Sequence, residues 1–401
     1  MSTVRTALVI GGGIAGPVTA IALRKAGIEA RVYEAYPGPA FGRGNTLALE
    51  PNGVAALDII DAGAAVRAVS VPIRHSYMTI GARSIAMPAA PDLEPRQLLQ
   101  RADLYRVLHD RAVAAGVSFE YRRKLVGVDE HGAGITAHFA DGASASADIL
   151  IGADGIRSTV RKLIDPRAPE AEYTGMLGFG ALLDAPELDL PPDTMYFAFG
   201  GNAYYLYGSV GDGKVLWGVN LPSAQYLSLN ESKEAGSAHW LRVIRETYGA
   251  DHPGGILARA TTEADLEMVG ALHIMPSVPH WYRGRMVLVG DAVHCPSNST
   301  GQGASQAIES SIQLARCLRD LDDPAAAFAA YEGLRRKRVQ RITARGAKIN
   351  HRKTPGPVGK KLMPVLMPLF TRLMNFEKVI DFEQRYRIDW SAPVQRELAR
   401  A

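Results

Sequence analysis

The feature that most constrains this chain is a glycine-rich turn near the N-terminus, placed between an apolar strand and a helix. Residues 6–10 read TALVI, a run typical of a buried parallel strand, and a G-x-G-x-x-G pattern follows at Gly11, Gly13 and Gly16. Glycine at these positions permits a tight turn, a close approach of the backbone to a pyrophosphate, and close packing of the helix on the strand. With a helix over 15–26 and a strand over 30–34, this segment predicts a βαβ unit.

An acidic residue, Glu34, ends the second predicted strand, 18 residues after Gly16. A carboxylate there can bind the ribose hydroxyls of an adenosine, and it repels a 2′-phosphate. The phosphates would meet the N-terminus of the first helix at Ile14 and Ala15, where free N–H groups favour an anion. The pattern therefore predicts a dinucleotide site, but it does not distinguish FAD from NAD.

Two later motifs are candidates for the other end of this site. Asp154 and Gly155 follow an apolar strand, although an Asp-Gly turn by itself is as consistent with an ordinary hairpin exit. Asp291 ends a strand over 287–290, at the edge of an open α/β sheet where ligands bind. His294 in the following loop could be a catalytic group, but we favour the interpretation that it orients the loop. The loop leads to a helix N-terminus that can stabilise a reduced, anionic flavin, through Gly301, Gln302, Gly303 and Ala304.

The remaining pattern predicts an α/β fold with a discontinuous, Rossmann-like dinucleotide-binding domain, which the family resemblance given below makes an FAD-binding domain. Short strands rich in Tyr, Phe and Val alternate with glycine turns between about residues 172 and 221, and they predict an inserted antiparallel β-sheet. We expect helices over 52–62, 98–115, 303–319 and 324–348. The predicted domains are an FAD-binding domain of residues 1–70, 98–170 and 284–350, a substrate-binding β-sheet domain of residues 71–97 and 171–283, and a C-terminal helical segment of residues 351–401.

Composition limits the classes of function. The 401 residues favour two or three structural units, and 47% hydrophobic with 21% charged residues is typical of a soluble globular enzyme. A net charge of +4, from 45 basic and 41 acidic residues, argues against a nucleic-acid partner. The densest basic run, residues 334–338, is predicted to be the solvated face of a helix.

The sequence carries no clear targeting or metal-binding signal. Cys295 and Cys317 form no C-x-x-C pattern, so neither a zinc site nor a disulfide framework is expected. No secretory signal pattern opens the sequence, and the apolar stretch 362–370 is interrupted by prolines and too short to span a bilayer. We expect a cytoplasmic enzyme without stable membrane insertion. Residues 362–376 are expected to pack on the core as a helix, rather than to touch a membrane or cover the pocket.

The three motifs, in this order and spacing, resemble those of the class A flavoprotein monooxygenases, the para-hydroxybenzoate hydroxylase type, over nearly the whole chain. The resemblance implies that the adenosine end of FAD is bound by Gly11, Gly13, Gly16 and Glu34. It also implies that Arg43 lies near the flavin and pyrophosphate, and that Gln100 and Arg101 contact the flavin side chain.

At the flavin end, the resemblance links Asp154 and Gly155 to both FAD and NAD(P)H, and it assigns the ribityl chain to Asp291. The chain departs from the family pattern at two positions. Asn298 stands where the family often has proline, and Ser310 stands where it often has aspartate. Both departures leave FAD binding as the expectation, and the first bears on the surroundings of the flavin ring.

The resemblance further implies a reaction. NADH or NADPH would reduce FAD, and reduced FAD would react with O₂ to give a flavin 4a-hydroperoxide that hydroxylates or epoxidises a small aromatic or polyketide-like substrate. The substrate would lie between the flavin and the inserted sheet. No catalytic base is evident, and the candidates in the flavin loop are His294 and Asn298. The candidate wall residues are His75, Tyr77, Tyr196, Phe197, Phe199, Tyr205, Tyr207, Trp217 and Asn220. About half of them must point away from the substrate, because side chains alternate between the two faces of a strand.

Two other functions fit the same fold. One is a flavin reductase or oxidase that inserts no oxygen, and the other is a flavin-holding binding protein without turnover. A flavin-dependent halogenase is disfavoured, because the strand that contains Trp217 lacks the W-x-W-x-I-P pattern of those enzymes. The sequence leaves open the substrate, the choice between NADH and NADPH, and whether the protein is a monomer or a homodimer.

Overall fold

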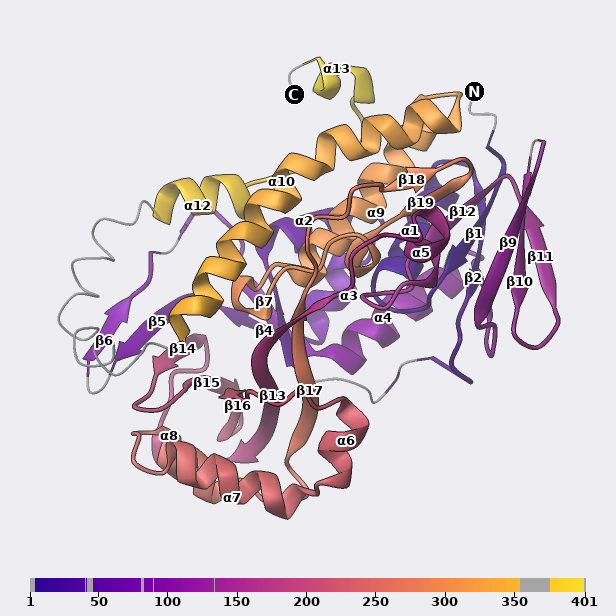
Figure 1. Ribbon diagram of the computed structural model, residues 1–401. Coiled ribbons are helices and arrows are strands. Elements are labelled where there is room, and N and C mark those ends of the chain that lie inside the picture. The colour runs from indigo at the N-terminus through magenta and orange to yellow at the C-terminus, as the bar shows by residue number, and fades with distance from the viewer. Residues whose placement is uncertain are drawn as a thin grey trace.

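A six-stranded sheet forms the centre of the computed structural model, which describes residues 4–39, 41, 46–80, 83–88, 90–132, 134–353 and 376–399 (Figure 1). The strand order is β18-β19-β12-β1-β2-β8, and all neighbours are parallel except β18 and β19. These strands come from distant parts of the chain, as expected for a discontinuous nucleotide-binding fold. Their bounds are β1 Thr6–Ile10, β2 Glu29–Tyr33, β8 Ser118–Glu120, β12 Ile149–Gly152, β18 Tyr282–Arg283 and β19 Met286–Leu288.

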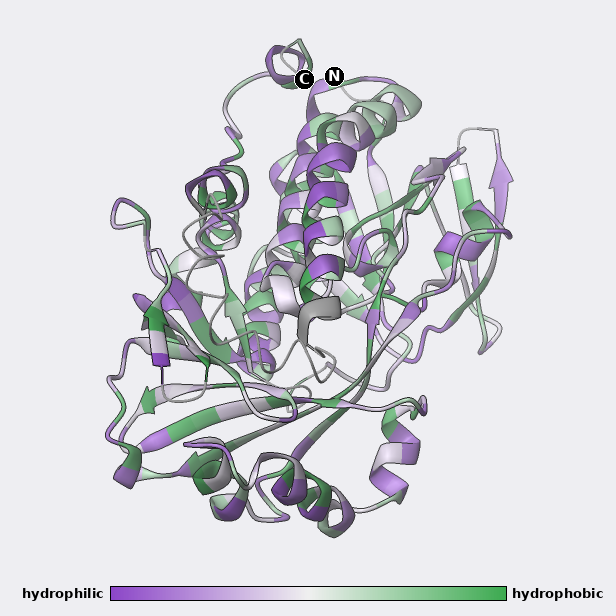
Figure 2. Ribbon diagram, turned by 60° about the vertical axis from the view of Figure 1, so that its left-hand side comes forward, coloured by the Kyte–Doolittle hydropathy of each residue, from purple (hydrophilic) through white to green (hydrophobic). Residues whose placement is uncertain are grey.

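Helices cover this sheet because each presents an apolar face to it. The main core joins β1, β12 and β19 to the buried sides of α1 (Ala15–Lys25), α9 (Gly303–Asp320) and α10 (Pro324–Lys353). Figure 2 shows hydrophobic residues gathered in the strands of the sheets and alternating with hydrophilic ones along the covering helices. The other helices are α2 Pro51–Ile59, α3 Gly63–Ala68, α4 Arg101–Ala114, α5 Thr159–Ile164, α12 Phe376–Glu383 and α13 Val394–Leu398.

A seven-stranded sheet lies below the first in Figure 1, in the order β17-β13-β16-β15-β14-β5-β6. Its pairs are antiparallel except β14 with β5, which are parallel. One face packs against α7 (Ser237–Tyr248) and α8 (Gly254–Ala260), with α6 (Leu229–Glu234) beside them. The strands are β5 His75–Ile80, β6 Arg83–Ala86, β13 Glu172–Asp184, β14 Thr194–Phe199, β15 Tyr204–Gly211, β16 Lys214–Pro222 and β17 Glu267–Ile274.

Two small sheets complete the fold. One is an antiparallel meander of β9 (Leu125–His131), β10 (Gly134–Phe139) and β11 (Ser144–Ala147). The other has the order β3-β7-β4, with bounds β3 Thr46–Leu49, β4 Val71–Ile73 and β7 Arg96–Gln100. The domain boundaries proposed from the sequence stay a prediction.

The structure corrects three local predictions. The helix expected over 98–115 begins only at Arg101, because Leu98 and Leu99 belong to β7, which pairs with both β3 and β4. The helix expected over 52–62 ends at Ile59, and a second helix, α3, begins at Gly63. The basic run 334–338 is not a solvated face throughout, since Arg335 and Arg338 are buried.

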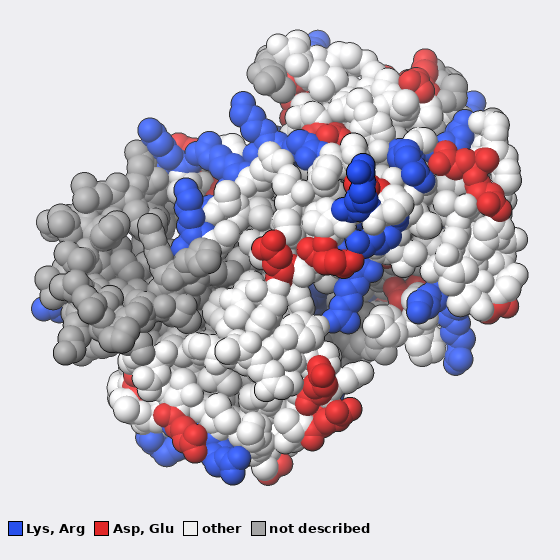
Figure 3. Space-filling view, viewed as in Figure 1, with Lys and Arg blue, Asp and Glu red and all other residues white. Residues whose placement is uncertain are grey.

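Two observations bear on partners. On the face seen in Figure 3, basic and acidic side chains are interspersed, with no continuous basic surface among the residues drawn in colour. Within the described ranges, no helix combines the length and the apolar character needed to cross a bilayer. The apolar stretch 362–370 lies outside the described residues.

Candidate functional site

A cavity of about 1680 Å³ lies between the carboxyl ends of the parallel strands and the seven-stranded sheet. It brings together residues from all three sequence motifs. Those that line it are Gly11, Gly13, Ile14, Ala15, Glu34, Arg101, Asp154, Gly155, Asp291, Gly301, Gln302, Gly303 and Ala304. Gly16 lies behind the turn and not on the cavity surface, and Arg43 falls outside the described residues.

The first glycine turn has the shape needed to receive a pyrophosphate. A Cβ added to Gly11 would lie 2.4 Å from the carbonyl oxygen of Ala153, and one added to Gly16 would lie 1.9 Å from the carbonyl oxygen of Gly11. Gly13 differs, because a Cβ there would meet no heavy atom of the described chain within 4 Å. Two glycines therefore permit chain packing, while Gly13 opens onto the cavity beside the N-terminus of α1, where anions are stabilised.

Glu34 is fixed at the end of β2 by backbone donors. Its Oε2 accepts a hydrogen bond from the amide of Gly12 at 2.6 Å, and its Oε1 accepts one from the amide of Tyr36 at 2.8 Å. A carboxylate has about four acceptor sites, so these two bonds orient the group and leave acceptors for ribose hydroxyls. The geometry thus fits the adenosine end of FAD.

Asp154 binds the first turn of α5, whose N-cap residue is Ser158. Its Oδ1 accepts from the Ser158 hydroxyl at 2.5 Å, and its Oδ2 accepts from the amides of Thr159 at 2.7 Å and Val160 at 3.1 Å. Burial raises the pKa of Asp154, and these bonds act in the opposite direction. The Asp-Gly motif therefore anchors the start of α5 and presents Gly155, with a φ of 74°, to the cavity.

Asp291 lies just after β19, at the carboxyl edge of the parallel sheet. Burial raises the pKa of Asp291, and the guanidinium of Arg101 acts in the opposite direction. Burial, and then the Asp291 carboxylate, raise the pKa of the Cys295 thiol, so Cys295 stays protonated beside it. Arg101 and Asp291 line the same cavity and form the polar pair that fits a ribityl chain.

The segment 294–302, called the cofactor loop below, connects Asp291 to the N-terminus of α9 at Gly303. His294 lies at its start, is buried, and does not line the cavity. Its Nε2 lies 2.7 Å from the Ser310 hydroxyl, and its ring packs against Trp281 with centroids 5.8 Å apart. This placement supports the interpretation that His294 orients the loop.

His294 predicts an acid sensitivity. Burial and the Arg335 guanidinium lower the pKa of His294 to about 3, from 6.5 in an unfolded chain. As pH falls below that unfolded value, only the unfolded state takes up this proton, so the free energy of unfolding decreases by about 1.4 kcal/mol per pH unit. We expect His294→Gln to remove this component between pH 6 and 4, measured by urea unfolding. If the free energy of unfolding changed with pH in the same way in parent and variant, His294 would not be the source of the acid sensitivity.

The seven-stranded sheet presents one face to the cavity. Because side chains alternate between the two faces of each strand, successive residues point toward the cavity and away from it in turn. Met195, Phe197 and Phe199 of β14 line the cavity, as do Leu206 of β15 and Asn220 of β16. The intervening aromatic residues face α7 and α8. These include Tyr205, Tyr207 and Trp217, whose indole N–H donates to the Thr261 hydroxyl at 3.0 Å.

The predicted substrate residues therefore divide into two groups. His75, Phe197, Phe199, Trp217 and Asn220 line the cavity, although the Trp217 indole also reaches Thr261 on the other side of the sheet. Tyr77 stacks on Tyr196, which stacks on Tyr207, on the opposite face of the sheet. For Tyr77, Tyr196, Tyr205 and Tyr207, the structure corrects the expected position, because the pattern of aromatic residues does not reveal which face of a strand is buried.

Several residues at the cavity belong to no motif that could have identified them from the sequence. Glu50, at the start of α2, is buried, and its carboxylate lies 3.5 Å from Arg96 of β7 and accepts from the Gln384 amide at 3.0 Å. Across the cavity, the Asn298 amide donates to the side-chain oxygen of Asn220 at 3.3 Å. This contact joins the cofactor loop to the substrate-facing sheet.

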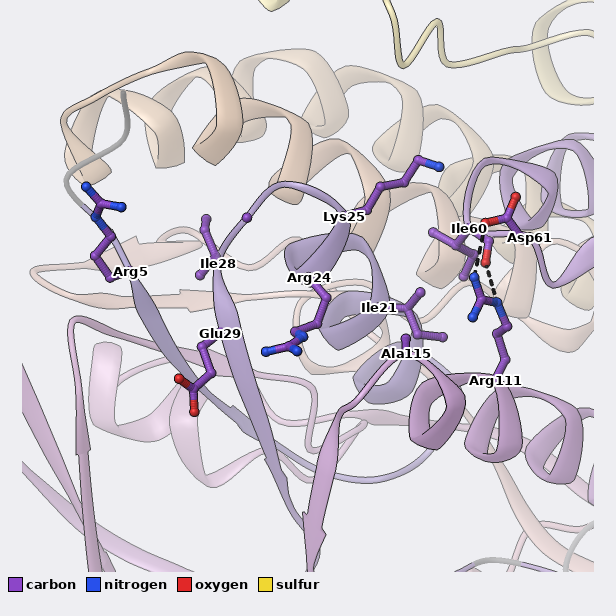
Figure 4. A pocket seen from close by; sticks show the side chains of 11 residues that line it. Arg5, Ile21, Arg24, Lys25, Ile28, Glu29, Ile60, Asp61, Arg111 and Ala115 are labelled. Carbon is purple, nitrogen blue, oxygen red and sulfur yellow. Dashed lines mark hydrogen bonds and ion pairs between the residues drawn. The ribbon is translucent and has the colours of Figure 1, made fainter.

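A second hollow of about 650 Å³ lies at the opposite, amino end of the parallel strands (Figure 4). Arg111 of α4 points toward the turn between α2 and α3, donating to the Ile60 carbonyl at 3.1 Å and to Asp61 at 3.0 Å. The cationic groups Arg5, Arg24 and Lys25 lie on its exposed rim and point in different directions. None of the cofactor motifs lines this hollow, so the candidate site is the larger cavity.

Comparison with known proteins agrees with this geometry. The family model described as "FAD binding domain" matches residues 4–346. The chain is 31% identical over 397 residues to the 3-amino-4-hydroxybenzoate 2-monooxygenase of Streptomyces platensis, covering 94% of this chain and 95% of that one. It is 28% identical over 356 residues to the FAD-dependent urate hydroxylase of Klebsiella pneumoniae, covering 85% and 88%.

Solved structures show the same fold. The crystal structure of Klebsiella pneumoniae HpxO with FAD and uric acid superposes with a TM-score of 0.80 at 24% identity, covering 94% of this chain and 95% of that one. Relatives of this chain carry the names of monooxygenases and hydroxylases, and one that of an epoxidase, which disfavours both a flavin enzyme without oxygen insertion and a binding protein without turnover. The chain therefore belongs to the class A flavoprotein monooxygenases, which are FAD-dependent enzymes.

Proposed function

We propose that this monooxygenase takes electrons from NADH or NADPH and transfers one atom of O₂ to a small, largely apolar ring compound of the aromatic or polyketide-like class. The observation that carries the proposal is the single cavity in which the FAD-binding motifs meet an apolar sheet face. Its volume of about 1680 Å³ exceeds the usual size of a one-ligand pocket, roughly 300–1,000 Å³, so cofactor and substrate fit together. The named relatives, which act on an aminohydroxybenzoate and on urate, support a ring substrate.

FAD, when bound, supplies the hydride acceptance and oxygen activation that no amino acid side chain provides. The residues of the chain hold and shield it. The Gly11–Gly16 turn and Glu34 would bind the adenosine end, while Arg101 and Asp291 would bind the ribityl end. The N-terminus of α9 would stabilise negative charge on the reduced flavin.

The substrate side combines apolar walls with a few polar groups. Phe197, Leu206 and Leu216 exclude water, which strengthens electrostatic interactions inside the site. At the boundary with the cofactor loop, the amides of Asn220 and Asn298 offer both donors and acceptors to a substrate hydroxyl or carbonyl. Their direct bond of 3.3 Å is long for an N–H···O bond, so a substrate oxygen can replace it at modest cost.

Stopped-flow mixing of the FAD-loaded protein with NADH or NADPH tests the proposed electron donor. We expect bleaching of the flavin absorbance by at least one of them, faster when aromatic acids, phenols or heterocyclic ring compounds are present. A flavin that neither nucleotide reduces, across such a panel, would contradict the proposal.

A matched pair of variants tests the substrate wall. Leu206 faces the cavity, and its neighbour Tyr207 faces away. We expect Leu206→Phe to raise the KM of a bulky substrate about 10-fold or more, because a single methylene in a pocket already has effects of about 1–3 kcal/mol and phenylalanine is larger than leucine by more than that. Tyr207→Phe should leave the KM unchanged, and neither variant should alter FAD content. Equal effects of the two variants on KM would exclude this sheet face as the wall.

A further inference from the structure

A buried polar cluster lies beneath the cofactor loop, between α2, α9 and α10. At its centre is Glu309 of α9, whose side chain is fully buried together with that of Arg335. Arg335 donates to Glu309 at 2.6 Å, and Arg338 donates to both carboxylate oxygens at 2.9 Å. Burial alone would raise the pKa of Glu309, but the two guanidinium groups hold it below its ordinary value, so Glu309 is charged.

The cluster reaches one end of the cofactor loop through Asn52. The Asn52 amide donates to Glu309 at 2.6 Å and to the Gln302 side-chain oxygen at 3.0 Å, and the Asn52 oxygen accepts from Gln302 at 3.3 Å. Gln302 is the last residue of the loop before α9, and it lines the cavity. The charge of Glu309 therefore orients Asn52, and Asn52 holds Gln302.

The cluster also reaches the other end of the loop. Arg335 donates to the Ser310 hydroxyl at 3.2 Å, and that hydroxyl lies 2.7 Å from Nε2 of His294, where the loop begins. Arg335 further donates to Gln306 at 2.6 Å, whose amide donates to Gln302 at 3.1 Å. Both ends of the segment 294–302 are thus connected to one carboxylate.

We propose that Glu309 is a positioning residue for FAD: its carboxylate fixes both ends of the cofactor loop, through Asn52 and Gln302 at one end and through Arg335, Ser310 and His294 at the other. Glu309 does not line the cavity, so it acts through these residues. Removing the charge of a buried carboxylate leaves two guanidinium groups without their partner, which is strongly unfavourable. The loop backbone, which would face the flavin, then loses the constraint that sets its shape.

The test compares Glu309→Gln and Asn52→Ala with Glu332→Gln as the control. Glu332 pairs with Arg336 at 2.7 Å on the partly exposed side of α10, so its loss should leave the loop unchanged. Two quantities are measured on the FAD-loaded protein: amide hydrogen exchange of peptides covering 294–302, and the visible circular dichroism of the bound flavin. Neither depends on turnover, so the result is independent of the proposed substrate and electron donor.

We expect loop exchange to become about tenfold faster in Glu309→Gln and in Asn52→Ala, as for the loss of one hydrogen bond to a charged group, with a changed flavin signal in both. The double variant should exchange no faster than Glu309→Gln alone, because the two residues act in series. Asn52→Ala keeps both ion pairs, so unchanged loop exchange in this variant overturns the proposal even if Glu309→Gln fails to fold. Unchanged loop exchange in Asn52→Ala, or additive effects in the double variant, would overturn the proposal.

Discussion

Replacing Asp291 by alanine is expected to give a folded protein that purifies with little FAD. Asp291 is the carboxylate at the edge of the parallel sheet, it lines the cavity, and Arg101 is its cationic neighbour. A charge-assisted hydrogen bond contributes about 1.5–3 kcal/mol, so losing one or two bonds to ribityl hydroxyls weakens binding by roughly 10- to 1,000-fold or more. The measurement is the ratio of flavin to protein absorbance after purification, followed by titration with FAD.

The control for this variant is Asp291→Asn, which keeps the shape of the side chain and removes its charge. Its FAD content and FAD affinity should lie between those of the parent and those of the alanine variant. Thermal unfolding of the FAD-free proteins shows whether the fold is intact. Because burial raises the pKa of Asp291, the alanine variant should be no less stable than the parent without FAD. If Asp291→Ala purified as yellow as the parent, the assignment of the ribityl site to this residue would be wrong.

The second large effect concerns two glycines of the same turn, one of which is expected to matter for FAD affinity alone and the other for the stability of the fold as well. Gly13→Ala is expected to leave the stability of the FAD-free protein nearly unchanged, because a Cβ there meets no heavy atom of the described chain within 4 Å. It should nevertheless weaken FAD binding strongly, since the methyl group enters the space where a pyrophosphate would approach the backbone. Gly16→Ala is expected to destabilise the FAD-free protein by several kcal/mol, roughly the scale of overpacking in a rigid site, because its Cβ would lie 1.9 Å from a backbone oxygen.

Urea unfolding of the two FAD-free variants and FAD titration of each provide the comparison. Gly13→Ala should lose only affinity, and Gly16→Ala should lose both stability and affinity. A stability loss of the same size in both variants would mean that Gly13 is needed for the fold, and that the turn does not open onto the cofactor as described.

The cofactor half of the site could be predicted because its determinants are local. The spacing of Gly11, Gly13, Gly16 and Glu34 follows from one turn and one strand, and the structure places that turn and carboxylate at the same cavity. Asp291 was located by the strand that precedes it. In each case a short stretch of chain determines the geometry.

The substrate half could not be predicted in the same way, because it depends on contacts between distant segments. Which face of β15 carries Leu206, and which carries Tyr207, depends on where the strand pairs and what covers it. The burial of Arg335 depends on Glu309, which lies on another helix, so the basic run looked like a solvated surface. Glu50 and Arg96 meet only when α2 and β7 come together.

The most direct test of the central claim is the fate of molecular oxygen. Purified FAD-loaded protein is mixed with NADH or NADPH, ¹⁸O₂ and a panel of small aromatic and polycyclic ring compounds, and the products are weighed by mass spectrometry. We expect at least one compound to gain a single ¹⁸O atom, with no conversion when O₂ is excluded. Conversion of a compound without O₂, or a product whose new oxygen comes from water, would contradict assignment of this protein as an oxygen-inserting flavoenzyme.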